Sequence, residues 1–178
     1  MDLRAVLLRL ARSLDEARIR FALIGGLALS AHGAARATVD LDFLAEGERD
    51  ADVHRILLAD GYECLYRSEN VANYASSDPE RGRVDFLFAR RSYGQAMLAR
   101  AAGHSVLGAT LLVVDPADLV GLKVQASSND PTRRHRDLAD VQSLLRSVPD
   151  LDHARVREYF RLFDREKELE ALLSELGR

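Results

Sequence analysis

Apolar residues recur along the chain at two different spacings, which predict helices and strands respectively. Near the start, Leu3, Val6, Leu7, Leu10 and Leu14 return every three or four positions, which predicts an amphipathic helix. Further along, short apolar runs are separated by glycines and polar turns, a pattern typical of strands alternating with helices. We expect strands over residues 21–26, 38–45, 62–67, 70–75, 83–89 and 110–115, and helices over 27–33, 51–61 and 92–101.

The pattern changes after residue 114, where helical spacing continues without further strands. Asp115 and Pro116 suit the N-cap and the first position of a helix over 115–126. We expect a basic loop over 127–136, a helix over 137–147, and two more helical stretches to the end. The sequence therefore predicts an α/β (α+β) fold. It has a core over residues 1–114, a small mixed β-sheet flanked by helices, and a helical C-terminal region over 115–178 packed on that core.

The bulk properties narrow the class of protein. The chain has 178 residues, of which 47% are hydrophobic, enough for the core of one domain. Its net charge of -3 does not indicate a nucleic-acid binder, although a local basic patch is compatible with it. A single cysteine excludes an internal disulfide, and no signal peptide or membrane-spanning apolar run is recognisable. We expect a cytoplasmic protein with no membrane partner.

Three aspartates interrupt strands that otherwise read as buried. Residues two apart in a strand point to the same face, so Asp40 and Asp42 project together, while Val39, Leu41 and Phe43 face the core. In the strand over 83–89, Asp85 likewise projects away from Val84, Phe86 and Phe88. If the two strands are neighbours, the three carboxylates meet.

Three carboxylates within a few ångströms repel one another unless cations lie between them. Oxygen ligands favour Mg²⁺, with Mn²⁺ as an alternative, and such clusters typically support phosphoryl chemistry between two metal ions. The simpler interpretation is that each aspartate pairs with a surface arginine or caps a turn. That interpretation suits Asp85 taken alone better than it suits the pair Asp40 and Asp42.

Small and hydroxyl residues around the aspartates suggest contacts to phosphate. Gly25 and Gly26 end a strand and open a helix, where bare backbone N–H groups can hold a phosphate, although a tight turn explains the pair equally well. Ser30 lies on that helix and could touch a ligand or simply be polar surface. Thr38 shares a face with Asp40, and it could bond a phosphate or orient a carboxylate.

Taken together, a strand leading into GG, a short helix, R-x-T-x-D-x-D over 36–42 and a later strand with a third aspartate resemble the nucleotidyltransferase superfamily of the DNA polymerase beta type. Within it, residues 24–44 most resemble the AbiEii-like group, which includes toxins of toxin–antitoxin systems. The match covers roughly residues 20–90, and a looser match extends through Lys123 and the RDLADV segment.

This resemblance implies a nucleotidyltransferase core, two catalytic magnesium ions and a nucleoside triphosphate. Gly25 and Gly26 would hold the triphosphate, Asp40 and Asp42 would bind both metals, and Asp85 would complete the catalytic metal site and help to activate the acceptor hydroxyl. Many members carry a serine where Leu27 stands here. The departure leaves phosphate binding to backbone groups or to two other side chains, Ser30 and Lys123.

Charged residues in the helical half offer further candidates. Lys123 lies among apolar neighbours, so it either extends to solvent or is directed at an anion. The resembled toxins carry a lysine that approaches the triphosphate, which implies that role for Lys123. Asp137 could be an N-cap, but an aspartate in a similar place matters in those toxins, so we count it with the nucleotide site. The basic residues at 133–136 could be a solvated loop or a contact to RNA or triphosphate.

The sequence thus predicts a metal-dependent nucleotidyltransferase that moves NMP from an NTP to a hydroxyl on RNA such as tRNA, a protein or a small molecule. It could be a toxin with an antitoxin partner. Two alternatives stay open. One is a catalytically degenerate module that binds a nucleotide or a partner. The other is a D-x-D glycosyltransferase, which the short chain and the GG turn disfavour.

Overall fold

The structure, a computed structural model, describes residues 2–34 and 37–177. Within these residues the chain forms one seven-stranded sheet in the order β3-β4-β5-β2-β1-β7-β6. Strand β2 runs parallel to β5, and β1 parallel to β7, while the other neighbours are antiparallel. The predicted mixed sheet is therefore confirmed. The strands are β1 (Phe21–Leu23), β2 (Asp40–Glu46), β3 (Glu63–Arg67), β4 (Val71–Ala75), β5 (Arg83–Ala89), β6 (Ala102–Val106) and β7 (Ala109–Val113).

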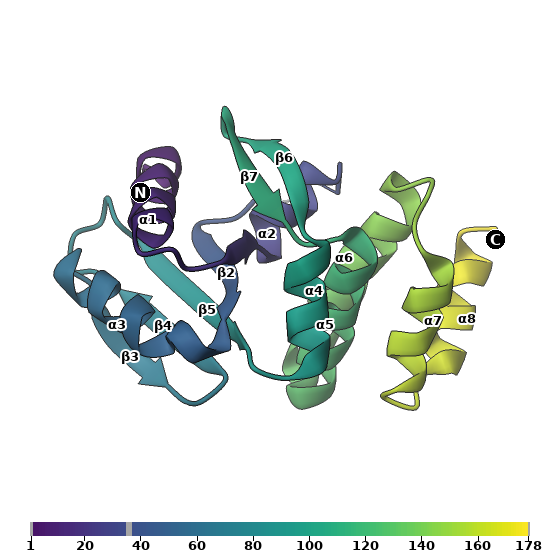
Figure 1. Cartoon of the computed structure of the whole chain (residues 1–178). Coiled ribbons are helices and arrows are strands. Elements are labelled where there is room, and N and C mark those ends of the chain that lie inside the picture. The colour runs from purple at the N-terminus through teal and green to yellow at the C-terminus, as the bar shows by residue number, and fades with distance from the viewer. Residues whose placement is uncertain (1, 35–36, 178) are drawn as a thin grey trace.

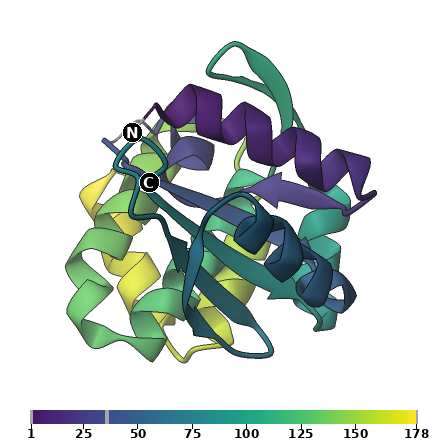
Figure 2. The same ribbon diagram turned by 90° about the vertical axis from the view of Figure 1, so that its left-hand side faces the viewer.

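Helices cover both faces of the sheet (Figure 1). Helices α1 and α3 lie on one face, as the turned view also shows (Figure 2). Helix α4 contacts β2 and β5 from the other side, and the C-terminal helices lie beyond it. The helices are α1 (Leu3–Glu16), α2 (Gly25–Ala31), α3 (Asp50–Ala59), α4 (Ser92–Arg100), α5 (Pro116–Asn129), α6 (Arg134–Ser147), α7 (His153–Arg161) and α8 (Glu166–Glu175), with short 3-10 turns η1 (Gly47–Arg49) and η2 (Pro131–Arg133).

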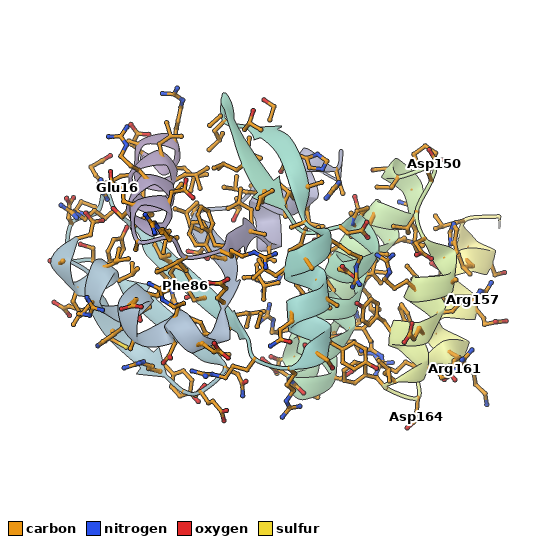
Figure 3. The ribbon with its side chains drawn as sticks, in the orientation of Figure 1. Glu16, Phe86, Asp150, Arg157, Arg161 and Asp164 are labelled. Carbon is orange, nitrogen blue, oxygen red and sulfur yellow. The ribbon has the colours of Figure 1, made fainter. Side chains whose placement is uncertain are left out.

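Aromatic rings fill the layer between the sheet and helices α1 and α3. Phe43 and Phe86 are fully buried and stack with ring centroids 5.1 Å apart. Tyr74 and Phe21 meet these two rings edge-on. Figure 3 places Phe86 inside this layer, while Arg157 stands on the outer side of the C-terminal helices. Burying rings of this size contributes several kcal/mol each and fixes which face of β2 and β5 points inward.

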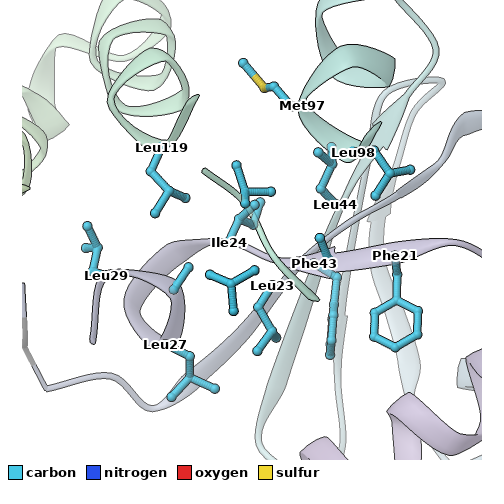
Figure 4. Packing of buried hydrophobic residues seen from close by; sticks show 14 of the residues in the cluster. Phe21, Leu23, Ile24, Leu27, Leu29, Phe43, Leu44, Met97, Leu98 and Leu119 are labelled. Carbon is cyan, nitrogen blue, oxygen red and sulfur yellow. The ribbon is translucent and has the colours of Figure 1, made fainter. Parts of the chain in front are cut away.

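The opposite sheet face is apolar at one end and polar at the other. Leu44 near the end of β2 belongs to the same buried cluster as Met97 and Leu98 of α4 (Figure 4). Toward the start of β2, Asp40 and Asp42 are only partly buried. Strand alternation therefore works as predicted, and it places the carboxylates where α4 does not reach.

One local prediction about the strands is wrong, and one strand was missed. Val39 was expected to face the core, yet it is 73% exposed, because β2 begins only at Asp40. Strand β6 was not predicted, since AGHSV lacks an alternation of large apolar residues. It pairs with β7 through a turn in which Leu107 and Gly108 both have positive φ, as two-residue hairpin turns require.

The predicted basic loop over 127–136 is also wrong. Helix α5 continues to Asn129, η2 follows, and α6 starts at Arg134. The reason is local, because the Asp130 side chain accepts a hydrogen bond from the N–H of Thr132 and Pro131 starts the turn, as Asp115 and Pro116 do for α5. Asp137 is consequently not an N-cap but a buried residue in the first turn of α6.

The helical region follows the last strand directly. Strand β7 ends at Val113, and all regular structure described after it is helical. Buried residues of α5, α6 and α7 join those of the sheet in one hydrophobic cluster. The division into 1–114 and 115–178 stays a prediction. Within residues 2–34 and 37–177, no helix is both long and apolar enough to cross a membrane.

Candidate active site

Two adjacent parallel strands carry the three predicted catalytic aspartates. In the register of β2 and β5, Asp42 lies directly opposite Asp85, and Asp40 opposite Arg83. Asp40, Asp42 and Asp85 are all partly buried, and their neighbours Leu41, Phe43 and Phe86 point to the opposite, fully buried face. The strands are therefore neighbours, as the three-carboxylate hypothesis requires.

Asp85 is a partly buried acid with a defined hydrogen-bond partner. Its Oδ1 accepts a hydrogen bond of 2.8 Å from the side-chain amide of Asn73 on β4. Burial raises the pKa of the Asp85 carboxyl above its usual range. The Asn73 hydrogen bond and the charge of Arg83 oppose this, while the negative charge of Asp40 acts with it. A carboxylate in this setting is stabilised by additional positive charge.

The two glycines lie directly beside this acidic face. Helix α2 begins at Gly25, which has φ +63°, a conformation that favours glycine. A Cβ on Gly25 would lie 2.0 Å from Oδ2 of Asp42, and a Cβ on Gly26 would lie 2.6 Å from Cβ of Thr38. Both glycines are thus required for close packing of the α2 backbone against residues of the aspartate segment.

The two predicted hydroxyl ligands are bonded to the backbone. Ser30 is exposed and its Oγ donates to the carbonyl of Gly26 at 3.1 Å, within α2. Thr38 Oγ1 donates to the carbonyl of Asp40 at 3.2 Å. Leu27, which stands in place of the usual serine, is buried. Arg36, the first residue of the R-x-T-x-D-x-D motif, lies outside the described residues.

Lys123 and Asp137 meet in the helical half. Lys123 is 7% exposed, and its Nζ lies 3.2 Å from Oδ1 of Asp137 and 2.6 Å from Oδ2 of Asp140. Asp137 is fully buried and Asp140 nearly so. The lysine is therefore neither extended into solvent nor open to a new anion without a change of partner. We refer to Lys123, Asp137 and Asp140 as the buried charge cluster.

Arg133 connects this cluster with the sheet. Its Nε lies 3.4 Å from Oδ2 of Asp137, and its positive charge also acts on the carboxyl of Asp85. Of the other basic residues, Arg134 pairs with Glu168 of α8. Arg133 thus interacts electrostatically with a member of each of the two predicted groups of site residues.

The donor set of the sheet face suits a hard divalent cation. Three carboxylates supply oxygen ligands only, which Mg²⁺ and Mn²⁺ accept, and the glycine backbone leaves Asp42 unobstructed by a Cβ at Gly25. Among residues 2–34 and 37–177, however, no group of three or more His, Cys, Asp or Glu side chains is arranged to hold a metal ion. The acids share a face and fit in chemistry, but they do not form a closed set of ligands.

Two residues in this region were not predicted. Asn73 lies in the middle of an expected strand, and the signal was its position on the polar side of the alternation in VANYA. Asp140 follows Asp137 by three positions, which places both on one helix face. Neither contact could be read from the sequence, because each depends on a partner in another element.

Comparison with solved structures shows which fold the chain has. The antibiotic-resistance factor ANT(2'')-Ia superposes with a TM-score of 0.69 at 16% identity, covering 99% of this chain and 98% of its own. An antigenic nucleotidyltransferase-like protein from Paracoccidioides brasiliensis gives 0.59 at 19% identity, with coverage of 97% and 92%. The lincosamide antibiotic adenylyltransferase LnuA gives 0.54 at 12%, covering 79% and 94%. At such identities the likeness is one of fold, which is that of nucleotidyltransferases.

The sequence comparison is more specific but shorter. The family model of the nucleotidyl transferase AbiEii toxin, from type IV toxin–antitoxin systems, matches residues 7–59. That segment includes the glycine pair, Asp40 and Asp42. No curated protein matches the chain by sequence. The resemblance drawn from the glycine and aspartate motif is therefore confirmed.

Proposed function

We propose that the protein is a metal-dependent nucleotidyltransferase, which transfers a nucleoside monophosphate from an NTP to an acceptor hydroxyl and releases pyrophosphate. The observation that carries this proposal is the shared sheet face. Asp42 lies opposite Asp85 on parallel strands, Asp40 projects beside it, and the backbone of Gly25 approaches the Asp42 carboxylate. The fold shared with nucleotidyltransferases supports the same reading.

In this proposal Asp40 and Asp42 would hold both Mg²⁺ ions, and Asp85 would complete the catalytic metal site and help to activate the acceptor hydroxyl. Bound Mg²⁺ supplies charge neutralisation on the phosphate oxygens. The protein contributes orientation, since an in-line attack depends on holding the hydroxyl close to the α-phosphate. Asn73 and the burial of Asp85 limit the positions that its carboxylate can adopt.

The nucleotide would lie between the glycine turn and the start of α6. Gly25 and Gly26 offer backbone to the triphosphate, with Ser30 and Thr38 at the edge of the same site. Asp137 acts on the nucleotide indirectly, by holding Lys123. Because Lys123 is held by Asp137 and Asp140, it contacts the triphosphate only by exchanging one of these partners.

The acceptor divides into three classes. ANT(2'')-Ia has been solved with adenylyl-2''-tobramycin, and LnuA with lincomycin, which supports a small hydroxylated molecule. The AbiEii match supports a toxin, whose acceptor would be RNA such as tRNA, or protein, and whose partner would be an antitoxin. The near-complete coverage of ANT(2'')-Ia by this chain favours testing the small molecules first.

The test is transfer of label from each α-³²P-labelled NTP, with Mg²⁺ or Mn²⁺, to aminoglycosides and lincosamides, total RNA, or a protein extract. We expect pyrophosphate release and label transfer with one acceptor class. Both should stop with EDTA and in Asp42→Asn. Absence of transfer and of pyrophosphate release with every NTP and acceptor would overturn the proposal.

One alternative keeps specific support. Leu27 stands where many members of the resembled family carry a serine, and the acids do not form a closed ligand set among the described residues. Both observations are compatible with a degenerate nucleotide-binding module. Such a module would bind NTP and metal in a titration without turnover. The glycosyltransferase alternative is disfavoured because the fold is that of nucleotidyltransferases. UDP-sugar turnover in the absence of NTP turnover would revive it.

A further inference from the structure

Asn73 is the residue of β4 that directly faces Asp85. The antiparallel register pairs Asn73 with Asp85 and places Val71 opposite Leu87, two residues further along. The Asn73 amide nitrogen donates to Oδ1 of Asp85 at 2.8 Å. An ionised carboxylate only accepts hydrogen bonds, so the amide must present its NH₂ group to it. Asn73 on β4 thus hydrogen-bonds Asp85 on β5, whereas Asp40 and Asp42 lie on β2, the other neighbour of β5.

The chemistry of an amide suits this position. An arginine there would neutralise Asp85 and compete with a cation, and an aspartate would add another like charge to the face. An amide donates without charge, so the carboxylate keeps its attraction for a metal. The bond occupies Oδ1 from the β4 side and leaves Oδ2 for a ligand. Restricting the rotation of Asp85 also removes conformational freedom that metal binding would otherwise have to remove.

We infer that Asn73 is a positioning residue that holds the Asp85 carboxylate in the orientation needed for a divalent cation. The inference rests on the proposed function for the role of Asp85. It goes beyond the proposed function because it assigns a role to Asn73 on β4, the strand next to the one that carries Asp85. Partners that hydrogen-bond metal-ligating groups typically change metal affinity or activity about 10–100-fold when they are removed.

The test compares Asn73→Leu, which keeps the approximate shape without the donor, with Asn73→Ser, which keeps a shorter donor. Val71→Ala is the matched control, because Val71 lies on the same face of β4 opposite an apolar residue. Mn²⁺ is titrated into each protein with and without α,β-methylene ATP, and free Mn²⁺ is measured by electron paramagnetic resonance. Urea unfolding is measured on the metal-free proteins.

We expect Asn73→Leu to weaken Mn²⁺ binding about 10–100-fold. Asn73→Ser should lose less, and Val71→Ala should bind as the wild type does. Metal-free stability should not follow this order. Equal Mn²⁺ affinity in Asn73→Leu and wild type, or a loss in Asn73→Ser as large as in Asn73→Leu, would overturn the inference.

The proposed function fails in a different way. If wild-type protein and Asn73→Leu differ in Mn²⁺ affinity but the wild type transfers no nucleotide, the positioning role stands and the transferase proposal falls. If the wild type binds no Mn²⁺ even with the ATP analogue, both fall.

Discussion

The acidic sheet face and the buried charge cluster place aspartates in opposite electrostatic conditions. On the sheet face, Asp40, Asp42 and Asp85 are like charges, partly buried, with a neutral amide as the partner of Asp85. In the buried charge cluster, two acids share a lysine within 3.2 Å. In the second region Arg133 adds a further cation, which also acts on Asp85.

This difference determines at which residues a loss of activity reports a functional role and at which it can result from unfolding. Removing an acid from a group of like charges relieves repulsion, so folding should survive while metal binding fails. Removing one member of a buried ion pair leaves an uncompensated charge in the interior, which is strongly destabilising. A loss of activity at Lys123 or Asp137 is therefore informative only beside a stability measurement.

The sharpest test of this contrast is Asp40→Asn or Asp42→Asn. Loss of a metal ligand removes several kcal/mol of transition-state stabilisation, so we expect nucleotide transfer to fall about 10³-fold or more. The free energy of unfolding should stay within about 1 kcal/mol of the wild type, or rise slightly, because a like charge is removed. Steady-state transfer assays and urea unfolding measure the two quantities.

The control is Asp150→Asn, an exposed aspartate in the turn before α7 (Figure 3), which should change neither quantity. Wild-type transfer in either Asp40→Asn or Asp42→Asn would contradict the metal assignment. Unfolding of both variants would show that the acids serve packing instead.

Lys123→Met should have the opposite profile. It removes the Lys123 charge from two buried acids, Asp137 and Asp140, which costs about 3–5 kcal/mol of stability. Adding Asp137→Asn and Asp140→Asn in the same chain should restore much of that loss, since the two negative charges are then removed together with the positive one. Urea unfolding of the single and triple variants checks the expectation.

The role predicted for Lys123 at the triphosphate is tested by steady-state kinetics under conditions in which Lys123→Met is folded. If Lys123 reaches the triphosphate, the Michaelis constant for NTP rises or turnover falls, while Mn²⁺ binding to the free protein persists. Wild-type kinetic constants in the folded variant would remove Lys123 from the nucleotide site and leave it a structural residue.

Gly25→Ala tests the close approach of α2 to the acidic face. Gly25 and Gly33 both have positive φ, so alanine costs about 1–2 kcal/mol at either position. Only at Gly25 would the new Cβ collide with the Asp42 carboxylate, whereas at Gly33 the nearest atom is 3.7 Å away. We expect Gly25→Ala to lose more stability than Gly33→Ala, and only Gly25→Ala to lose transfer, about 10²-fold for a displacement near 1 Å. Equal transfer by the two variants would contradict the role of Gly25.

The sequence predicts a structural feature well when the residues that determine it lie within one short segment of the chain. Strand β5 was predicted at its observed bounds because RVDFLFA alternates strictly, and Gly33 and Gly61 were predicted as helix ends and have positive φ. The common face of Asp40 and Asp42 follows from the same alternation. The bond between Asn73 and Asp85 depends on strand register, and the contact of Lys123 with Asp140 depends on the packing of two helices. No local pattern encodes either.

The smallest expected effect concerns His32, which connects the end of α2 with the residue before the N-cap of α5. It lies at the end of α2, and its Nε2 donates to the carbonyl of Val114, next to the N-cap Asp115 of the helix that carries Lys123. Burial lowers the pKa of His32. The Val114 carbonyl and the charge of Asp115 oppose this, while the nearby ring of His104 on β6 acts with burial.

Because its pKa is lower in the folded state, His32 takes up a proton first in the unfolded chain as the pH falls. Its contribution to stability is therefore complete above pH 6.5 and is lost as the pH drops from there through the lowered folded-state pKa. Urea unfolding from pH 8 to 5 should show a steeper fall for the wild type than for His32→Gln, which keeps a donor for Val114 but cannot titrate. His104→Asn should make the fall shallower by removing the like charge beside His32. If the free energy of unfolding depends on pH in the same way in wild type and His32→Gln, the contact of His32 with Val114 does not respond to pH.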